Sequence, residues 1–408
     1  MSGEIMSHWN KSFARVLWLI VFCFSASLTF GAVPQVRSSY RIPFELTNNL
    51  VVLRGSINNS RPLFLLLDTG ASGSVINESR VKELGLNLEG QTKATTGNGP
   101  VEASFVRGVT LSVSGIEFPD LTLTSIRLSG LEAGFGRPVD GILGYEIFNR
   151  FVVEIDYISR IVTLHDPKSY KYSGSGQAIP LMIKDNRPFV HARVMLVNAK
   201  IAEGNFEFDI GQVGALTLGE SFTSKNELLK FTRNTLQIST GSILVGRTNA
   251  QIGRIQKLQL GRFIIQNPFT TFVPGNSGEE DTTDYAGLIG AEILRRFKVT
   301  IDYSRRQVLL EPNKHFREAY EFDMSGMSLT SGVDFKTFKV RTLIENSPAT
   351  EVGLHIGDTI TAIDGKSTAK LTLEQIRRMF RRDGRRYSLS IKRNESVLPI
   401  NIKTRRLI

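Results

Sequence analysis

Two aspartates, Asp68 and Asp209, lie in sequence surroundings that suit catalytic carboxylates. Each ends a strand-like run and is followed two residues later by a glycine, which lets another part of the backbone approach closely. Two carboxyl groups held about 3 Å apart cannot both ionise, so one pKa rises and the other falls. Such a pair supplies a general acid and a general base that share one water molecule. We therefore take Asp68 and Asp209 as a candidate catalytic pair.

The elements around Asp68 predict a strand, a tight turn and a second strand. An apolar run at residues 63–67 leads into Asp68, and a short strand-like stretch follows at residues 74–76. Residues 40–167 read as further short strands with turn signals between them. A strong turn formed by Gly97, Asn98 and Gly99 lies about 30 residues beyond the aspartate.

Residues 179–312 repeat the plan of the first half, which is the clearest organisational signal in the chain. Residues 206–211 correspond to 65–70, residues 285–290 to 139–144, and residues 297–303 to 151–157. Each half carries one Asp-x-Gly loop. The repeat predicts a mainly β protein with two similar lobes, each contributing one carboxylate.

Residues 66–72, Leu-Leu-Asp-Thr-Gly-Ala-Ser, resemble the active-site signature of aspartic peptidases of the bacterial retropepsin and pepsin-like kind. The resemblance implies a two-lobed acid-protease β-barrel body and an aspartic endopeptidase that acts on peptide or protein substrates through a water activated by Asp68 and Asp209. It further implies that residues 142–144 and 288–290 brace the two loops. The implied supporting residues are Thr69, Gly70, Ser72 and Gly211. The implied flap, which closes over substrate, is Gly97, Asn98 and Gly99, with a counterpart near residues 240–242.

The second loop departs from the family pattern at Ile210 and Val213. In the family, a threonine hydroxyl from each loop bonds across the interface, and Ile210 has none, so that pairing cannot be symmetric. Three readings stay open: an asymmetric working pair, a catalytically silent peptide-binding scaffold in which Asp209 is a relic, and pairing of the Asp68 loops of two chains. Taken alone, Asp68 can also be read as a turn residue that caps local amides.

Residues from about 323 onward resemble a PDZ domain. The resemblance rests on the series Ser-Pro-Ala at 347–349, Gly-Leu at 353–354, Gly-Asp at 357–358 and Ile-Asp-Gly at 363–365. It implies that a peptide ligand, with a free C-terminus as one candidate, adds as a strand to a sheet edge. The matching carboxylate-binding loop is Gly326, Met327, Ser328 and Leu329. Such a domain recruits substrates or regulates activity in exported bacterial proteases.

The N-terminus predicts an exported protein. Lys11 and Arg15 precede an apolar run at residues 16–30, and Gly31-Ala32 follows, which is the pattern of a secretory signal peptide cleaved near Ala32. The expected location is the periplasm or cell envelope, or the medium after secretion. If the segment stays uncleaved, it tethers the chain to a membrane.

Composition limits the other function classes. The net charge is +11, but no nucleic-acid motif accompanies it, so we expect no nucleic-acid partner. The single cysteine, Cys23, lies in the signal segment, and the histidines lack metal-ligand spacing, so we expect no cofactor, no metal and no disulfide. The predicted organisation is a signal peptide at 1–32, lobe 1 at 33–170, lobe 2 at 171–318 and a PDZ domain at 319–408.

Overall fold

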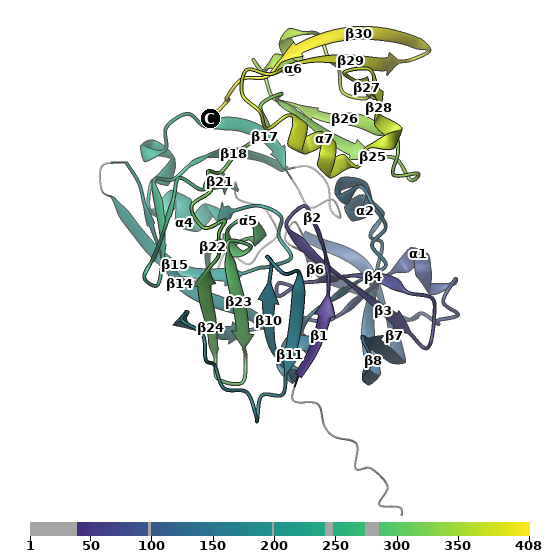
Figure 1. Cartoon of the computed structure of the whole chain (residues 1–408), viewed down its shortest axis with the longest axis vertical. Coiled ribbons are helices and arrows are strands. Elements are labelled where there is room, and N and C mark those ends of the chain that lie inside the picture. The colour runs from purple at the N-terminus through teal and green to yellow at the C-terminus, as the bar shows by residue number, and fades with distance from the viewer. Residues whose placement is uncertain (1–38, 97–98, 198–199, 241–247, 274–284) are drawn as a thin grey trace, which may run out of the picture. The chain divides into compact units, whose positions relative to one another are not determined.

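The structure is a computed structural model, and it describes residues 39–96, 99–197, 200–240, 248–273 and 285–408. The predicted signal peptide at 1–32 lies outside these residues. Within them, no helix combines the length and the apolar character needed to cross a membrane. The described chain is mainly β and has two similar lobes followed by a C-terminal domain, as the sequence predicts (Figure 1).

The first lobe is built on one sheet, which has eight strands within the described residues. In spatial order they are β2 (Glu45–Thr47), β3 (Leu50–Ile57), β4 (Leu63–Leu67), β9 (Gly141–Leu143), β5 (Val75–Asn77), β8 (Ile116–Ile126), β7 (Gly99–Val113) and β6 (Glu89–Thr96). Its helices are α1 (Glu78–Val81), α2 (Ser129–Phe135) and α3 (Tyr145–Arg150).

Strand β4 carries Asp68 at its C-terminal end and lies between β3 and β9. Leu63, Leu65 and Leu67 enter the main apolar core, whereas Leu66 enters a smaller apolar cluster. Because both faces of β4 are covered, its sequence is a continuous apolar run rather than an alternating one.

The second lobe repeats this arrangement with a sheet of ten strands in the described part of the chain. In spatial order they are β17 (Leu236–Thr240), β18 (Thr248–Arg254), β21 (Phe269–Phe272), β16 (Leu216–Leu218), β22 (Tyr285–Ile289), β15 (Ile201–Phe208), β14 (Arg187–Met195), β19 (Lys257–Leu260) and β20 (Phe263–Gln266), with β13 (Met182–Lys184) beside β14. Its helices are α4 (Glu220–Lys225), η1 (Leu228–Phe231) and α5 (Ala291–Leu294). Strand β15 is the counterpart of β4 and carries Asp209 at its end.

A third sheet joins the two lobes (Figure 1). Its order is β1 (Ser39–Pro43), β11 (Ile161–His165), β10 (Val152–Asp156), β23 (Phe297–Asp302), β24 (Gln307–Pro312) and β12 (Gln177–Pro180). The repeated segments meet at its centre, where Val153 pairs with Ile301 and Ile155 with Val299 in antiparallel register. The internal repeat of the sequence is therefore a pseudo-two-fold relation in space.

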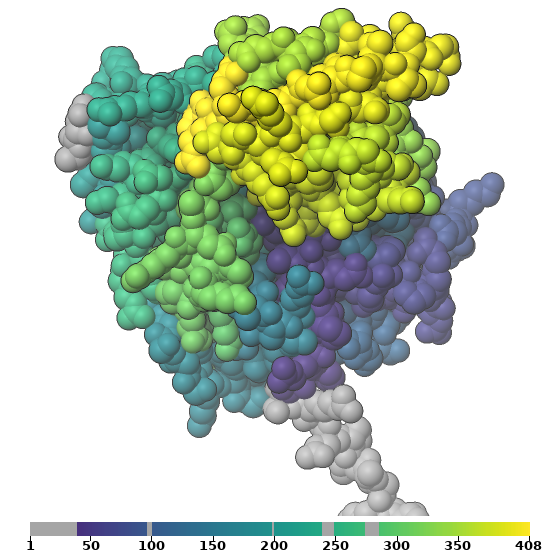
Figure 2. Space-filling view, turned by 45° about the horizontal axis from the view of Figure 1, so that its top comes forward, coloured from purple at the N-terminus to yellow at the C-terminus, as the bar shows by residue number. Residues whose placement is uncertain are grey.

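The C-terminal domain has its own apolar core, separate from that of the lobes. Its elements are β25 (Met327–Ser331), β26 (Phe338–Leu343), α6 (Pro348–Glu351), β27 (Thr359–Ile363), β28 (Lys366–Ser367), η2 (Thr368–Lys370), α7 (Leu373–Met379), β29 (Arg386–Arg393) and β30 (Ser396–Lys403). The sheet order β25-β26-β27-β29-β30 leaves β25 at one edge. The hairpin of β29 and β30 lies at the surface, shown in yellow in Figure 2.

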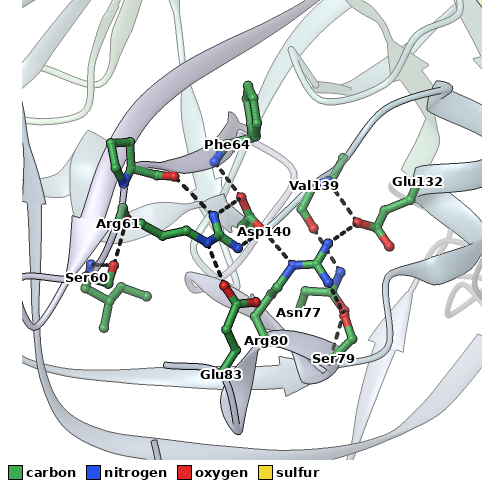
Figure 3. Close-up of polar contacts among 12 residues, drawn as sticks. Ser60, Arg61, Phe64, Asn77, Ser79, Arg80, Glu83, Glu132, Val139 and Asp140 are labelled. Carbon is green, nitrogen blue, oxygen red and sulfur yellow. Dashed lines mark hydrogen bonds and ion pairs between the residues drawn. The ribbon is translucent and has the colours of Figure 1, made fainter. Parts of the chain in front are cut away.

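A buried carboxylate, Asp140, ties together the strands beneath the Asp68 loop (Figure 3). It lies just before β9, accepts a hydrogen bond from the Phe64 amide at 2.8 Å and pairs with Arg80 of α1 at 2.7 Å. Arg80 also bonds Glu132 of α2 at 2.8 Å, and Glu132 accepts from the Val139 amide. These bonds link β4, β9, α1 and α2, and they give Asp140 a structural role.

Replacing Asp140 with Asn is expected to lower the free energy of unfolding by about 2 kcal/mol, because the Phe64 amide and Arg80 lose a charged acceptor, although Arg80 keeps Glu132. Burial raises the pKa of Asp140, but the Phe64 amide and the guanidinium groups of Arg80 and Arg61 outweigh it and hold that pKa below its usual range. The stabilisation is therefore full above the unfolded-state pKa of about 4 and is lost as the pH falls through the folded-state pKa. Urea denaturation at neutral and acid pH should show the difference between variant and wild type shrinking in acid. Asp120→Asn, at an exposed position of the same lobe, is the matched control.

Candidate active site

The two aspartates are delivered by equivalent strand ends in the two lobes. Asp68 follows β4 and its amide donates to the Leu143 carbonyl of β9 at 3.0 Å. Asp209 follows β15 and its amide donates to the Ile289 carbonyl of β22, also at 3.0 Å. The two aspartates therefore make equivalent backbone hydrogen bonds, in agreement with the predicted correspondence of the two loops.

The two loops bring their carboxyl groups together across the lobe interface. A Cβ built on Gly211 would lie 2.1 Å from Cγ of Asp68, and one built on Gly70 would lie 3.0 Å from Cγ of Asp209. Each carboxyl group thus packs on the glycine of the opposite loop, and each of the two carboxyl groups affects the pKa of the other. We call Asp68 and Asp209 the aspartate pair; both keep partial exposure to solvent.

Backbone amides hold each carboxylate in place. The Gly70 amide donates to Oδ1 of Asp68 at 2.7 Å, and the Gly211 amide donates to Oδ1 of Asp209 at 2.7 Å. Burial raises the pKa of Asp68, and amide bonds from its own loop oppose the increase. Burial raises the pKa of Asp209 further, with the negative charges of Asp68 and Glu207 adding to it. One proton shared between two carboxyl groups is the state that such a pair favours.

Thr69 supplies both of the cross-loop hydrogen bonds that the structure describes here. Its buried hydroxyl donates to the Phe208 carbonyl at 2.6 Å and accepts from the Ile210 amide at 3.0 Å. These two backbone groups flank Asp209. Ile210 is fully buried in the main apolar core instead of returning a hydroxyl, so the pairing is asymmetric as expected. Both of these cross-loop hydrogen bonds therefore use the side chain of Thr69, in the first loop.

Comparisons with known families match two parts of the chain. An aspartyl protease family model matches residues 53–147, which span β4, the Asp68 loop and β9. A PDZ domain model matches residues 339–393. This chain carries a retropepsin-like aspartyl protease domain and a C-terminal PDZ domain. A sequence comparison with curated proteins gave no match.

In the protease domain, each loop is braced from behind by the predicted apolar-apolar-glycine element. A Cβ on Gly144 would lie 2.6 Å from the Ala71 carbonyl oxygen, and one on Gly290 would lie 2.4 Å from the Gly214 carbonyl oxygen. Neither position has room for a side chain, because backbone carbonyls cannot move aside cheaply. These contacts fix the position of each aspartate loop relative to the sheet of its own lobe.

Ser72 lies on the exposed side of the first loop, where its backbone carbonyl accepts from Asn186 at 3.1 Å. The buried hydroxyl of this region belongs to Ser74 instead. Ser74 donates to Glu146 at 2.7 Å and accepts from the Gly144 amide at 3.1 Å. Ser74 therefore links the loop to its brace, a role that the sequence motif did not indicate.

The predicted flap coincides with a hairpin of β6 and β7, which pairs up to Thr96 and Gly99. Its tip, Gly97 and Asn98, lies outside the described residues. In the second lobe β17 and β18 form the corresponding hairpin, pairing up to Thr240 and Thr248. Residues 241 and 242 of the expected counterpart also lie outside.

The sequence motif did not indicate a role for three further residues near the aspartate pair, which are Glu207, Arg187 and Tyr303. Glu207 is 4% exposed and forms an ion pair with Arg187 at 3.2 Å. Tyr303 is buried, and its pKa is raised by burial and by the charges of Asp68, Glu207 and Asp209. The available signal was Glu207 itself, a charged residue between Phe206 and Phe208 just before Asp209. In the described part of the chain, no group of three or more His, Cys, Asp or Glu residues could hold a metal ion.

Side chains just outside the PDZ loop at Gly326–Leu329 fix its conformation. Gly326 has φ +80° and its Cβ position lies 2.1 Å from Cβ of Ser347, so glycine is required there. Its amide donates to Asp323 at 2.9 Å, and the Met327 amide donates to Ser325 at 3.2 Å. Met327 and Leu329 are buried in the PDZ core.

The edge strand β25, where a peptide would add, has neighbours on its outer side. Arg377 of α7 donates to the Leu329 carbonyl at 2.9 Å. Helix α2 of the protease domain also packs on β25, with Ser331 donating to the Ala133 carbonyl at 3.1 Å. Strand β25 therefore borders the first lobe.

Replacing Thr69 with Val is expected to lower the free energy of unfolding by about 2 kcal/mol, because two buried backbone groups lose their partner. Any peptide cleavage should fall about 100-fold, because Asp209 is no longer held in position. Thr69→Ser keeps the hydroxyl and is the control. Chemical denaturation and a cleavage assay measure the two effects; equal behaviour of the Val and Ser variants would show that the hydroxyl is dispensable.

Proposed function

We propose that this protein is an exported aspartic endopeptidase that hydrolyses peptide bonds with the Asp68 and Asp209 pair. The mutual packing of the two carboxyl groups and the opposite glycines is the observation that carries the proposal. This packing requires both lobes of one chain, so it disfavours pairing of the Asp68 loops from two chains. The double hydrogen bond from Thr69 supports an asymmetric working pair despite Ile210.

The chemistry requires one proton to be held by the aspartate pair. The ionised carboxylate takes a proton from water, and the water oxygen forms a bond to the carbon of the scissile carbonyl. The protonated carboxyl donates its proton to the carbonyl oxygen, which neutralises the negative charge that would otherwise develop there in the tetrahedral intermediate. The C–N bond then breaks as the amine nitrogen receives the proton that was taken from water, and a hydroxyl on the former carbonyl carbon returns a proton to the second carboxyl, which restores the pair.

The direct test is incubation of the purified mature protein with a diverse peptide mixture between about pH 3 and pH 7, the range in which such pairs share a proton. New peptide termini are identified by mass spectrometry. The competing function is a silent peptide-binding scaffold, which Ile210 and Val213 favour. Folded wild-type protein that binds these peptides without cutting them would establish that second function.

We further propose that the PDZ domain recruits the peptide or protein substrates, with a free C-terminus as its ligand. PDZ domains bind peptides, and the position of β25 at a sheet edge, beside the first lobe, supports recruitment. Comparison of peptides with free and amidated C-termini tests this, since amidation should weaken binding to the full chain.

The apolar run at residues 16–30 supports export to the periplasm or envelope, and N-terminal sequencing of the protein from cell fractions tests cleavage near Ala32.

A further inference from the structure

Glu207 places a charged group where the first lobe has an apolar one. In β15, Phe206 and Phe208 enter the main core, so the intervening Glu207 points to the opposite face of the sheet. The counterpart of Glu207 in β4 is Leu66, which enters an apolar cluster. Both residues are 4% exposed. The two halves of the aspartate pair therefore have electrostatically different surroundings.

Glu207 faces the same part of the first loop as Asp209. A Cβ built on Gly70 would lie 3.1 Å from Oε1 of Glu207 and 3.0 Å from Oδ2 of Asp209. The two carboxyl groups thus approach Gly70 together, from positions two residues apart at the end of β15. A negative charge on Glu207 acts directly on Asp209 in a setting with little water.

Arg187 anchors the far oxygen of Glu207. Its Nη1 lies 3.2 Å from Oε2, whereas the oxygen facing Gly70 is Oε1. Arg187 begins β14, and its neighbour Asn186 donates to the Ser72 carbonyl of the first loop at 3.1 Å. One turn of the second lobe therefore holds both the Glu207 ion pair and the loop of Asp68.

Asp68 and Tyr303, two other titratable groups near Asp209, contribute no positive charge there. Asp68 adds negative charge, and Tyr303 is kept neutral because burial and the surrounding carboxylates raise its pKa. Tyr145 of α3 packs on the Tyr303 ring. Arg187 forms an ion pair with Glu207, and its side chain is 35% exposed, so water screens part of its charge.

We propose that Glu207, anchored by Arg187, is a positioning residue that makes Asp209 the proton-holding member of the aspartate pair and Asp68 the base. This inference rests on the proposed peptidase function for its catalytic meaning. In hydrolysis, Asp68 takes the proton from water, and Asp209 donates its proton to the oxygen of the scissile carbonyl. Glu207 touches neither the water nor the substrate and acts through Asp209.

The test uses the full chain with Glu207→Gln, which keeps the shape and removes the charge. Aspartate labelled with carbon-13 at the carboxyl group lets NMR follow each titration, and Asp68→Asn and Asp209→Asn identify the two signals. The titration midpoint of Asp209 should fall by about one pH unit in Glu207→Gln. The alkaline limb of the cleavage rate should move to lower pH by a similar amount, with the maximal rate changed much less.

Glu203→Gln is the matched control, because Glu203 lies on the same strand and pairs with Arg193 of β14 at 2.8 Å, yet is exposed. It should leave the Asp209 titration in place. Arg187→Gln should shift Asp209 in the opposite direction from Glu207→Gln, to higher pH. Circular dichroism confirms that each variant is folded before titration.

The outcomes separate this inference from the proposed function. An Asp209 midpoint that is unchanged in folded Glu207→Gln, or a shift that appears at Asp68 instead, would overturn the inference even if the protein cuts peptides. A shifted Asp209 midpoint in a protein that cuts no peptide would retain the proton placement and reject the peptidase.

Discussion

Peptide cleavage is expected to fall about 1,000-fold or more in both Asp68→Asn and Asp209→Asn, because an amide can neither accept the proton of the water nor donate one to the carbonyl oxygen. Both variants should fold, since each removes one of two closely spaced carboxyl groups whose charges repel when both are ionised. Mass spectrometry of a peptide digest measures the loss. Asp120→Asn, which is exposed in the first lobe, should cleave as wild type does.

The pattern of loss decides between the remaining readings of the second loop. Loss in both variants shows that the two lobes of one chain share the reaction. Loss in Asp68→Asn alone would point to pairing between chains or to a mechanism with one carboxylate. Retained cleavage in both variants would place the activity elsewhere and contradict the proposed function.

Replacing Gly211 with Ala is expected to have the next largest effect. The added methyl carbon would lie 2.1 Å from Cγ of Asp68, so one loop must move. Displacement of about 1 Å at a reacting group costs roughly 100-fold in rate, and overpacking of this kind costs about 1–3 kcal/mol of stability. Cleavage kinetics and urea denaturation on the same preparations measure both.

Gly214→Ala provides the control for that experiment within the same loop. The nearest atom to a Cβ at Gly214 is 4.0 Å away, on the Gln212 side chain, so the methyl group has room. It should leave rate and stability nearly unchanged. Equal effects of the two substitutions would mean that general loop flexibility, rather than contact with Asp68, explains the loss.

The sequence was informative about the protease domain because its signals are local. A buried strand followed by Asp-x-Gly is visible within about eight residues, and the repeat of that unit predicted both carboxylates and the two lobes. The PDZ domain was equally accessible, because the short motifs at residues 347–365 follow one another closely along the chain. Neither prediction required knowledge of which strands pair.

The supporting contacts were less accessible, because they join residues far apart in the sequence. Thr69 bonds the Ile210 amide across 141 positions, so its two hydrogen bonds to the second loop cannot be read from the loop sequence. Ile210 lacks the hydroxyl that the family pattern has at this position, but Thr69 supplies both of the cross-loop bonds described. The choice of Ser74 over Ser72 likewise depends on which hydroxyl faces Gly144 once β9 lies behind the loop.

Residue types and spacing alone predicted two similar β lobes that each carry one aspartate, and made these two aspartates a candidate pair. Only the tertiary structure decided how unequal their surroundings are. Glu207 and Leu66 occupy equivalent places in the repeat. The sequence shows that one is charged and the other apolar, but only the fold shows what each meets: Arg187 and the first loop for Glu207, an apolar cluster for Leu66. Strand periodicity fixes the face on which a side chain lies, but long-range packing fixes what it meets there, and the pKa of a carboxyl group depends on the second.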